Sequence, residues 1–132
     1  MSLALKGAAL LGIAIATVNC TVPPSQTVET SFQNKIGFDL NQFDENGLYG
    51  PEDGKRSLDY EFCLPANNAT YANQVLSIDP TLDFYERSPG RIGCDETQEL
   101  VIGNTGQPNF REVLMTLAAL DYIERIEPVY WE

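Results

Sequence analysis

The sequence predicts an α+β domain in which an antiparallel sheet carries two helices on one face. Two observations lead to this prediction. Several short segments alternate apolar and polar residues, which is typical of half-buried strands, and two others space their apolar residues three and four apart, as amphipathic helices do. Proline and glycine clusters separate these segments and so mark them as individual elements.

A first strand is expected just before Pro65, where four apolar residues alternate with polar ones: Leu58, Tyr60, Phe62 and Leu64. A helix follows, because Asn68 is a favourable N-cap and Asp79-Pro80 ends the pattern. Its apolar face is expected to comprise Tyr71, Val75, Leu76 and Ile78.

Two further strands are expected at residues 81–87 and 98–103, with four residues directed inward: Leu82, Phe84, Leu100 and Ile102. The intervening residues would then share the outward face of the sheet with those of the first strand. That face would carry the carboxylates of Asp59, Glu61, Asp83 and Glu99, together with Tyr85, Arg87 and Val101. We interpret these acids as the soluble surface of an open sheet rather than as a paired-carboxylate active site.

The second helix is expected to begin at Asn109, whose spacing to Glu112 resembles a capping box. Its core face would contain Phe110, Val113, Leu114, Leu117 and Leu120. A last strand is expected between Ile123 and Trp131, at a sheet edge because it contains Pro128. The resulting β-α-β-β-α-β order predicts a ferredoxin-like domain with one open sheet face.

The cysteines favour one intramolecular disulfide. The chain has three cysteines, at positions 20, 63 and 94. In an exported protein Cys63 and Cys94 would pair by default. The ferredoxin-like plan places the end of the first strand beside the start of the third, where these two residues lie, so the predicted topology and the predicted disulfide agree.

Residues 1–20 are expected to be an export signal. Lys6 is the only charge, and the apolar run from Gly7 to Val18 is shorter than the roughly 20 residues of a membrane-spanning helix. Cys20 resembles the lipidated cysteine of a bacterial lipobox, although cleavage after Ala16 is an alternative, as is an uncleaved anchor. Export would place the protein in the periplasm, the cell envelope or the extracellular space.

The remaining chain is expected to divide in two. Residues 21–56 would form a Pro/Thr-rich tether and an irregular acidic arm, and residues 57–132 the folded domain. Four carboxylates of the arm are candidate cation ligands: Asp39, Asp44, Glu45 and Asp53. Their spacing does not fit an EF-hand, and a solvated acidic loop is the favoured interpretation.

Composition excludes several functions. The chain has no histidine, so Ser–His–Asp and Cys–His catalysis and imidazole metal sites are excluded. Its formal net charge of -11 argues against nucleic acid and anionic lipid surfaces as partners. We expect a non-enzymatic binding protein without a cofactor. A small acidic metal-binding protein or enzyme is an alternative.

A protein partner is the expected ligand. Tyr85 and Arg87 could form a docking site on the open sheet face, and Tyr130 and Trp131 could form one at the C-terminal edge. Aromatic residues and arginine are the side chains that most often anchor protein interfaces.

The last third of the chain resembles the closing helix and strand of subtilisin-family propeptides and their inhibitor relatives. The matching positions are Leu120, Ile123, Ile126, Glu127 and Pro128, after the helix that begins near Phe110. The resemblance implies the same β-α-β-β-α-β plan. It also implies an alternative function, in which the C-terminal tail occupies a protease cleft.

Overall fold

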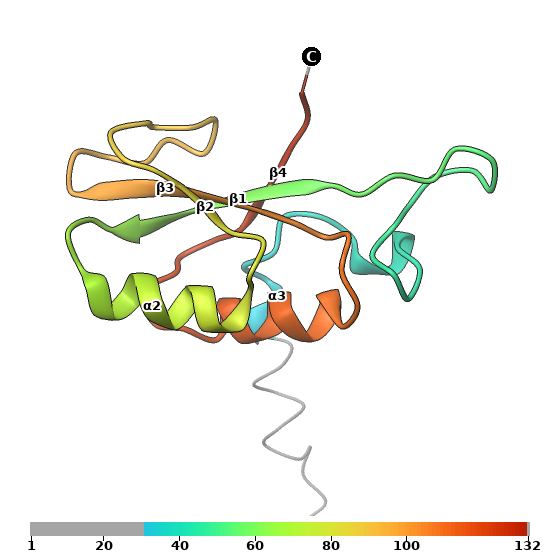
Figure 1. The fold of residues 1–132 in the computed structure, drawn as a ribbon, viewed down its shortest axis with the longest axis horizontal. Coiled ribbons are helices and arrows are strands. Elements are labelled where there is room, and N and C mark those ends of the chain that lie inside the picture. The colour runs from blue at the N-terminus through green and yellow to red at the C-terminus, as the bar shows by residue number, and fades with distance from the viewer. Residues whose placement is uncertain (1–30, 132) are drawn as a thin grey trace, which may run out of the picture.

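The computed structural model describes residues 31–131, so the predicted signal segment and Cys20 lie outside the described residues. The elements are a 3-10 helix η1 (Leu40–Gln42), β1 (Asp59–Pro65), α2 (Ala69–Ile78), β2 (Asp83–Tyr85), β3 (Gln98–Asn104), α3 (Phe110–Ala118) and β4 (Glu127–Val129). The strands form one sheet in the order β2-β3-β1-β4, and every neighbouring pair is antiparallel. Both α2 and α3 lie on the same face of this sheet (Figure 1), so the predicted α+β class with an antiparallel sheet is confirmed.

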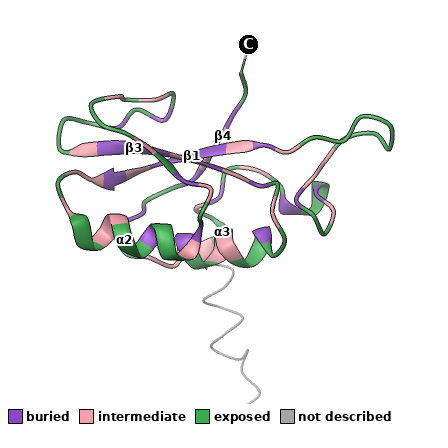
Figure 2. Ribbon diagram, viewed as in Figure 1, coloured by how far each residue is buried: buried purple, intermediate pink, exposed green. Residues whose placement is uncertain are grey.

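The main core lies between the helices and the sheet. It contains the alternating residues that the sequence assigned to the inward face of β1 and the apolar residues of α3: Leu58, Tyr60, Phe62, Leu64, Phe110, Leu114 and Leu117. Figure 2 shows buried residues along the strands and on parts of both helices. Within residues 31–131, no helix is both long and apolar enough to cross a membrane.

The two helix starts differ from each other. Asn68 caps α2 as predicted, since its side-chain oxygen accepts a hydrogen bond from the Tyr71 N–H at 3.0 Å. Asn109 makes no such bond, and its backbone is left-handed (φ 63°) rather than extended as at Asn68. The predicted capping box of α3 is therefore wrong. Asparagine tolerates this left-handed geometry better than most residues, which explains its place in the turn.

The predicted faces of β3 are wrong. The register pairs Phe62 with Val101, so Val101 faces the helices, and Glu99 and Gly103 share its side of the sheet. Leu100 and Ile102 therefore lie on the opposite face, beside Cys63. Because Leu100, Val101 and Ile102 are all apolar, their pattern does not show which of them face the helices. Only the pairing of β3 with β1 decides this.

The second sheet face is partly covered. Residues 86–97, which connect β2 to β3 and are called the strap below, cross this face as the yellow-to-orange loop of Figure 1. The predicted Cys63–Cys94 disulfide is confirmed, with a Cα–Cα distance of 5.5 Å, and it ties the strap to β1. Ile92 and Cys94 pack with Leu100 in a second apolar cluster under the strap. The face expected to be open is therefore covered where the strap crosses β1 and β3, whereas Asp83 and Tyr85 of β2 remain exposed on it.

The acidic arm is part of the compact fold from residue 36 onward. Ile36, Leu40 and Phe43 belong to the same buried cluster as the residues of β1 and α3. Lys35 donates from Nζ to the carbonyls of Leu120 and Ile123, at 3.2 and 2.8 Å. The sequence analysis placed the start of the domain at residue 57. Ile36, Leu40 and Phe43 did not stand out there, because they are dispersed among acids and glycines.

Candidate functional site

The strap is held against the sheet by a buried carboxylate. Glu61 of β1 is only 2% exposed, and its Oε1 accepts a hydrogen bond from the Ile92 N–H at 2.5 Å. Arg125 donates from Nη2 to the Ile92 carbonyl at 2.6 Å, so both backbone groups of Ile92 are bonded. The acid predicted to lie on an exposed sheet face is therefore covered, and it helps to position the strap.

Burial raises the pKa of Glu61, because the charged form loses its hydration. The N–H groups of Ile92 and Arg91 and the charges of Arg91 and Arg125 oppose this rise. When a folded-state pKa is raised, the folded protein keeps the proton at pH values where the unfolded chain has lost it. The contribution of Glu61 to stability is therefore fully present below its unfolded pKa, and it falls as the pH rises through the folded pKa.

We expect Glu61→Gln to remove the loss of folding stability that Glu61 causes as the pH rises. Glutamine retains an oxygen that can accept the Ile92 N–H bond, and it has no charge to bury. Relative to wild type, the variant should gain stability as the pH rises from 3.5 to 7.5, measured by urea unfolding across that range. Glu61→Leu should instead lose about 1–3 kcal/mol, because the buried Ile92 N–H is left unpaired. A constant difference between Glu61→Gln and wild type at every pH would contradict this account.

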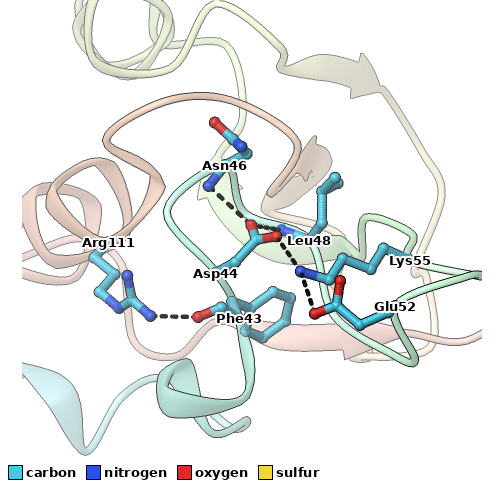
Figure 3. Close-up of polar contacts among 7 residues, drawn as sticks. All are labelled: Phe43, Asp44, Asn46, Leu48, Glu52, Lys55 and Arg111. Atoms are coloured by element: carbon cyan, nitrogen blue, oxygen red, sulfur yellow. Dashed lines mark hydrogen bonds and ion pairs between the residues drawn. The ribbon is translucent and has the colours of Figure 1, made fainter.

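The arm does not assemble the predicted cation ligands. Asp44 organises a turn, since its Oδ1 accepts from the N–H groups of Asn46 and Leu48 and its Oδ2 from Lys55 at 3.0 Å (Figure 3). These donors, the Leu48 N–H above all, lower the pKa of Asp44. Asp39 caps η1 by accepting from the Asn41 N–H.

Nor do the other acids of the arm complete a metal site. Of the residues that the structure describes, no three His, Cys, Asp or Glu side chains are grouped to hold a metal ion. Glu45 and Asp53, the other two predicted ligands, are exposed. The best-placed of the four candidate carboxylates, that of Asp44, already binds a lysine and two backbone N–H groups.

A second polar arrangement lies at the C-terminal edge. Tyr130 and Trp131 follow β4 and are 59% and 65% exposed. The Trp131 indole donates to Asp59 Oδ2 at 2.7 Å, and Asn104 donates to Asp59 Oδ1 at 2.7 Å. Arg91 of the strap donates to the Tyr130 carbonyl at 2.6 Å and lies 5.9 Å from the centre of the Trp131 ring. The Trp131 side chain is thus anchored although it is exposed, and Tyr130 is held through its backbone carbonyl.

These residues border a surface groove of about 400 Å³, which the start of β1 closes on the other side. We call this region the C-terminal surface and define it by Tyr49, Arg56, Asp59, Tyr130 and Trp131. Arg56 lies 5.6 Å from the centre of the Tyr49 ring, so the groove contains a second arginine–aromatic pair. The arrangement offers flat apolar faces, guanidinium donors and a carboxylate, which suits recognition of another molecule.

The predicted partner-binding residues divide between two places. Tyr130 and Trp131 belong to the C-terminal surface beside β4, whereas Tyr85 ends β2, on the opposite edge of the sheet, and Arg87 lies at the start of the strap. Tyr85 and Arg87 are both exposed. The predicted group of outward carboxylates divides as well, since Glu99 lies on the helix face.

The sequence interpretation missed the contributions of Tyr49, Arg56 and Arg91. Tyr49 and Arg56 stand seven residues apart in a segment read as irregular, where their backbones pair. Arg91 reaches Trp131 only because the disulfide holds the strap over the sheet. The one signal in the sequence that could have indicated the role of Arg91 was its position three residues before Cys94, which the disulfide joins to β1.

Comparison with known proteins gives no relative. No family model, no curated protein and no solved structure matches the chain.

Proposed function

We propose that this chain is an exported, non-enzymatic binding protein that docks a protein partner through its C-terminal surface. The proposal treats the domain as ferredoxin-like, which the β2-β3-β1-β4 order and the two helices on one face support. The observation that carries the function is the pair Tyr130 and Trp131, which are the two most exposed large hydrophobic residues of the described chain. Asp59 holds the Trp131 side chain, and Arg91 holds the backbone carbonyl of Tyr130.

Preorganisation favours this surface over other exposed residues. A side chain that is already fixed loses less conformational entropy when a partner binds. Trp131 is fixed by one hydrogen bond and one cation–π contact. Tryptophan, tyrosine and arginine are also the residue types that most often contribute strongly to binding.

Charge indicates the chemistry of the partner. The chain has a formal net charge of -11, so a basic protein surface would be attracted over several ångströms and would associate faster at low ionic strength. Side chains rather than strand addition should carry the recognition, because Pro128 in the edge strand β4 has no N–H to donate to another strand.

Export is part of the proposal. The Cys63–Cys94 disulfide is consistent with an oxidising compartment. Cys20 either carries lipid and tethers the domain to a membrane, or is removed with the signal. The intact mass of the protein purified from membrane and soluble fractions distinguishes these alternatives, since an acylated protein starting at Cys20 differs in mass from a chain that lacks it.

The docking surface can be tested by photo-crosslinking. A photoreactive phenylalanine analogue replaces Trp131 in one variant, and in a control variant it replaces Leu76, an exposed apolar residue of α2. In the native envelope fraction, the probe at position 131 should give a discrete adduct that the probe at position 76 does not give. Equal diffuse labelling from both positions would contradict the proposal.

Once the adduct identifies the partner, Trp131→Ala should weaken its binding by about 30-fold or more, as expected for a central aromatic anchor. Leu76→Ala should leave the affinity within about twofold. Because Trp131 is exposed and lies at the end of the described chain, the substitution should not change the melting temperature. Unchanged affinity of the alanine variant, measured by calorimetry with the purified partner, would exclude Trp131 as the anchor.

Protease inhibition is a second candidate, favoured by one observation. Beyond β4 the chain trace runs away from the sheet (Figure 1), and this terminal segment carries the exposed residues Tyr130 and Trp131, the kind of feature that a protease cleft would receive. If this is the function, the purified protein inhibits a subtilisin-type protease, and deletion of residues 130–132 abolishes inhibition without unfolding the domain. Cleavage of the tail without inhibition would reject this candidate.

A further inference from the structure

A cleft of about 520 Å³ lies at the opposite end of the β1–β3 pair from the C-terminal surface. The strap forms one side through Pro89 and Cys94, and the turn between β1 and α2 forms the other through Ala66 and Asn67. The disulfide fixes the distance between these two sides, because it joins the strap to the end of β1. The cleft is thus built by the fold and is not a gap between mobile loops.

Glu99 is a buried acid without a partner in this cleft. It lines the cleft, yet its side chain is only 9% exposed. Among residues 31–131 it forms no hydrogen bond through its carboxylate and no ion pair. Burial raises its pKa, and the charge of nearby Glu86, which also lines the cleft, raises it further. Its carboxylate oxygens are not among the buried unpartnered atoms of the described residues, so they are accessible from the cleft, where a cation would offset both effects.

Within residues 31–131, none of the other charged groups of the cleft is paired with Glu99. Arg87 lines the cleft, but in the described part of the chain it forms no ion pair with Glu86, Glu96 or Glu99. Asp95 is already engaged, since its Oδ1 accepts from both the N–H and the hydroxyl of Thr97. Four carboxylates and one guanidinium therefore surround the space. Two of the carboxylates, those of Glu86 and Glu99, are close enough to repel each other.

We propose that this cleft binds an organic cation, namely a guanidinium or primary ammonium group, with Glu99 as the main counter-charge and Glu86 as the second. Such a group carries several N–H donors and can bond to two carboxylates at once. A metal ion is the poorer ligand, because no three metal-binding side chains of the described residues are grouped together. The volume is also far larger than one ion needs.

The test is a titration of the isotope-labelled, disulfide-bonded full chain, followed by amide chemical shifts. The two probes are agmatine, a free guanidinium compound, and the blocked tripeptide acetyl-Gly-Arg-Gly-amide. We expect saturable shifts at Asn67, Glu96 and Glu99. Glu99→Gln should raise the dissociation constant about tenfold or more, since one charge-assisted contact is lost. Because this variant is nearly isosteric and removes a buried charge, it should be at least as stable as wild type.

The matched control is Glu45→Gln, which removes the same charge from an exposed acid of the arm and should change the dissociation constant less than about twofold. Tighter binding of agmatine, which carries a primary ammonium as well as a guanidinium group, supports a free small organic dication as the ligand, and tighter binding of the peptide supports a partner's arginine. Equal weakening by both substitutions, shifts that never saturate, or saturable shifts with calcium chloride at the same residues would overturn the proposal. Trp131→Ala should not affect either probe, so failure here is distinguishable from failure of the C-terminal docking surface.

Discussion

Replacing Cys63 and Cys94 together by serine is expected to lower the free energy of unfolding by about 3–4 kcal/mol. The disulfide closes a loop with a sequence separation of 31 residues. In the chain-entropy account, opening that loop gives the unfolded chain more conformations while the folded state changes little. For a domain of this size the loss corresponds to a decrease in melting temperature on the order of 15–25 °C.

The same substitution should release the strap before it unfolds the sheet. Ile92 would then be held only by Glu61 and Arg125, so its amide should exchange with solvent faster than the amides of β1 and β3. Reduction of the wild-type protein serves as the matched control, because it opens the same loop without a substitution. A loss below about 1 kcal/mol, with Ile92 still protected, would mean that the strap is held by its non-covalent contacts alone.

Phe43→Ala is expected to cost about 3–5 kcal/mol, as a buried phenylalanine in a core does. Phe43 is 6% exposed and packs against three aromatic rings, those of Phe38, Tyr49 and Phe110, with centroids 5.9, 5.2 and 5.3 Å away. Its carbonyl also accepts from Arg111 Nη2 at 2.6 Å, which ties the arm to α3 (Figure 3). Chemical denaturation of the full chain measures the loss.

Phe43→Leu is the control for this prediction, because it preserves most of the apolar volume and should cost less than about 1.5 kcal/mol. The pair of variants decides whether the arm belongs to the domain. If Phe43→Ala unfolds with wild-type stability, the arm folds separately and the sequence-based boundary at residue 57 is the better description.

The sequence predicted elements well where one face of a segment is apolar and the other polar. The alternation of Tyr60 and Phe62 with acids and Cys63 identified β1 and its inward face, and the spacing of Leu114 and Leu117 identified the core face of α3. It failed at Leu100, Val101 and Ile102, because a strand buried on both faces has no alternation to read. It also failed in the arm, where three apolar anchors are dispersed among acids and glycines.

The candidate sites show the same division. Tyr130 and Trp131 were recognisable as unusual residues at the end of the sequence, but their contacts with Asp59 and Arg91 were not predicted. Asp44 was one of four candidate cation ligands in a loop interpreted as solvated, and only the fold shows that Lys55 binds its carboxylate. The unpartnered position of Glu99 likewise depends on which face of β3 meets the helices.

The sequence by itself determined the α+β class and the Cys63–Cys94 pairing, because these depend on local periodicity and cysteine number. Only the tertiary structure decided that the strap covers part of the second sheet face, that Glu61 is buried beneath it and that the arm joins the core. The physical reason is that strand register and loop placement arise from contacts between residues far apart in the chain. Local patterns report which side chains avoid water, and the register decides which neighbours they meet.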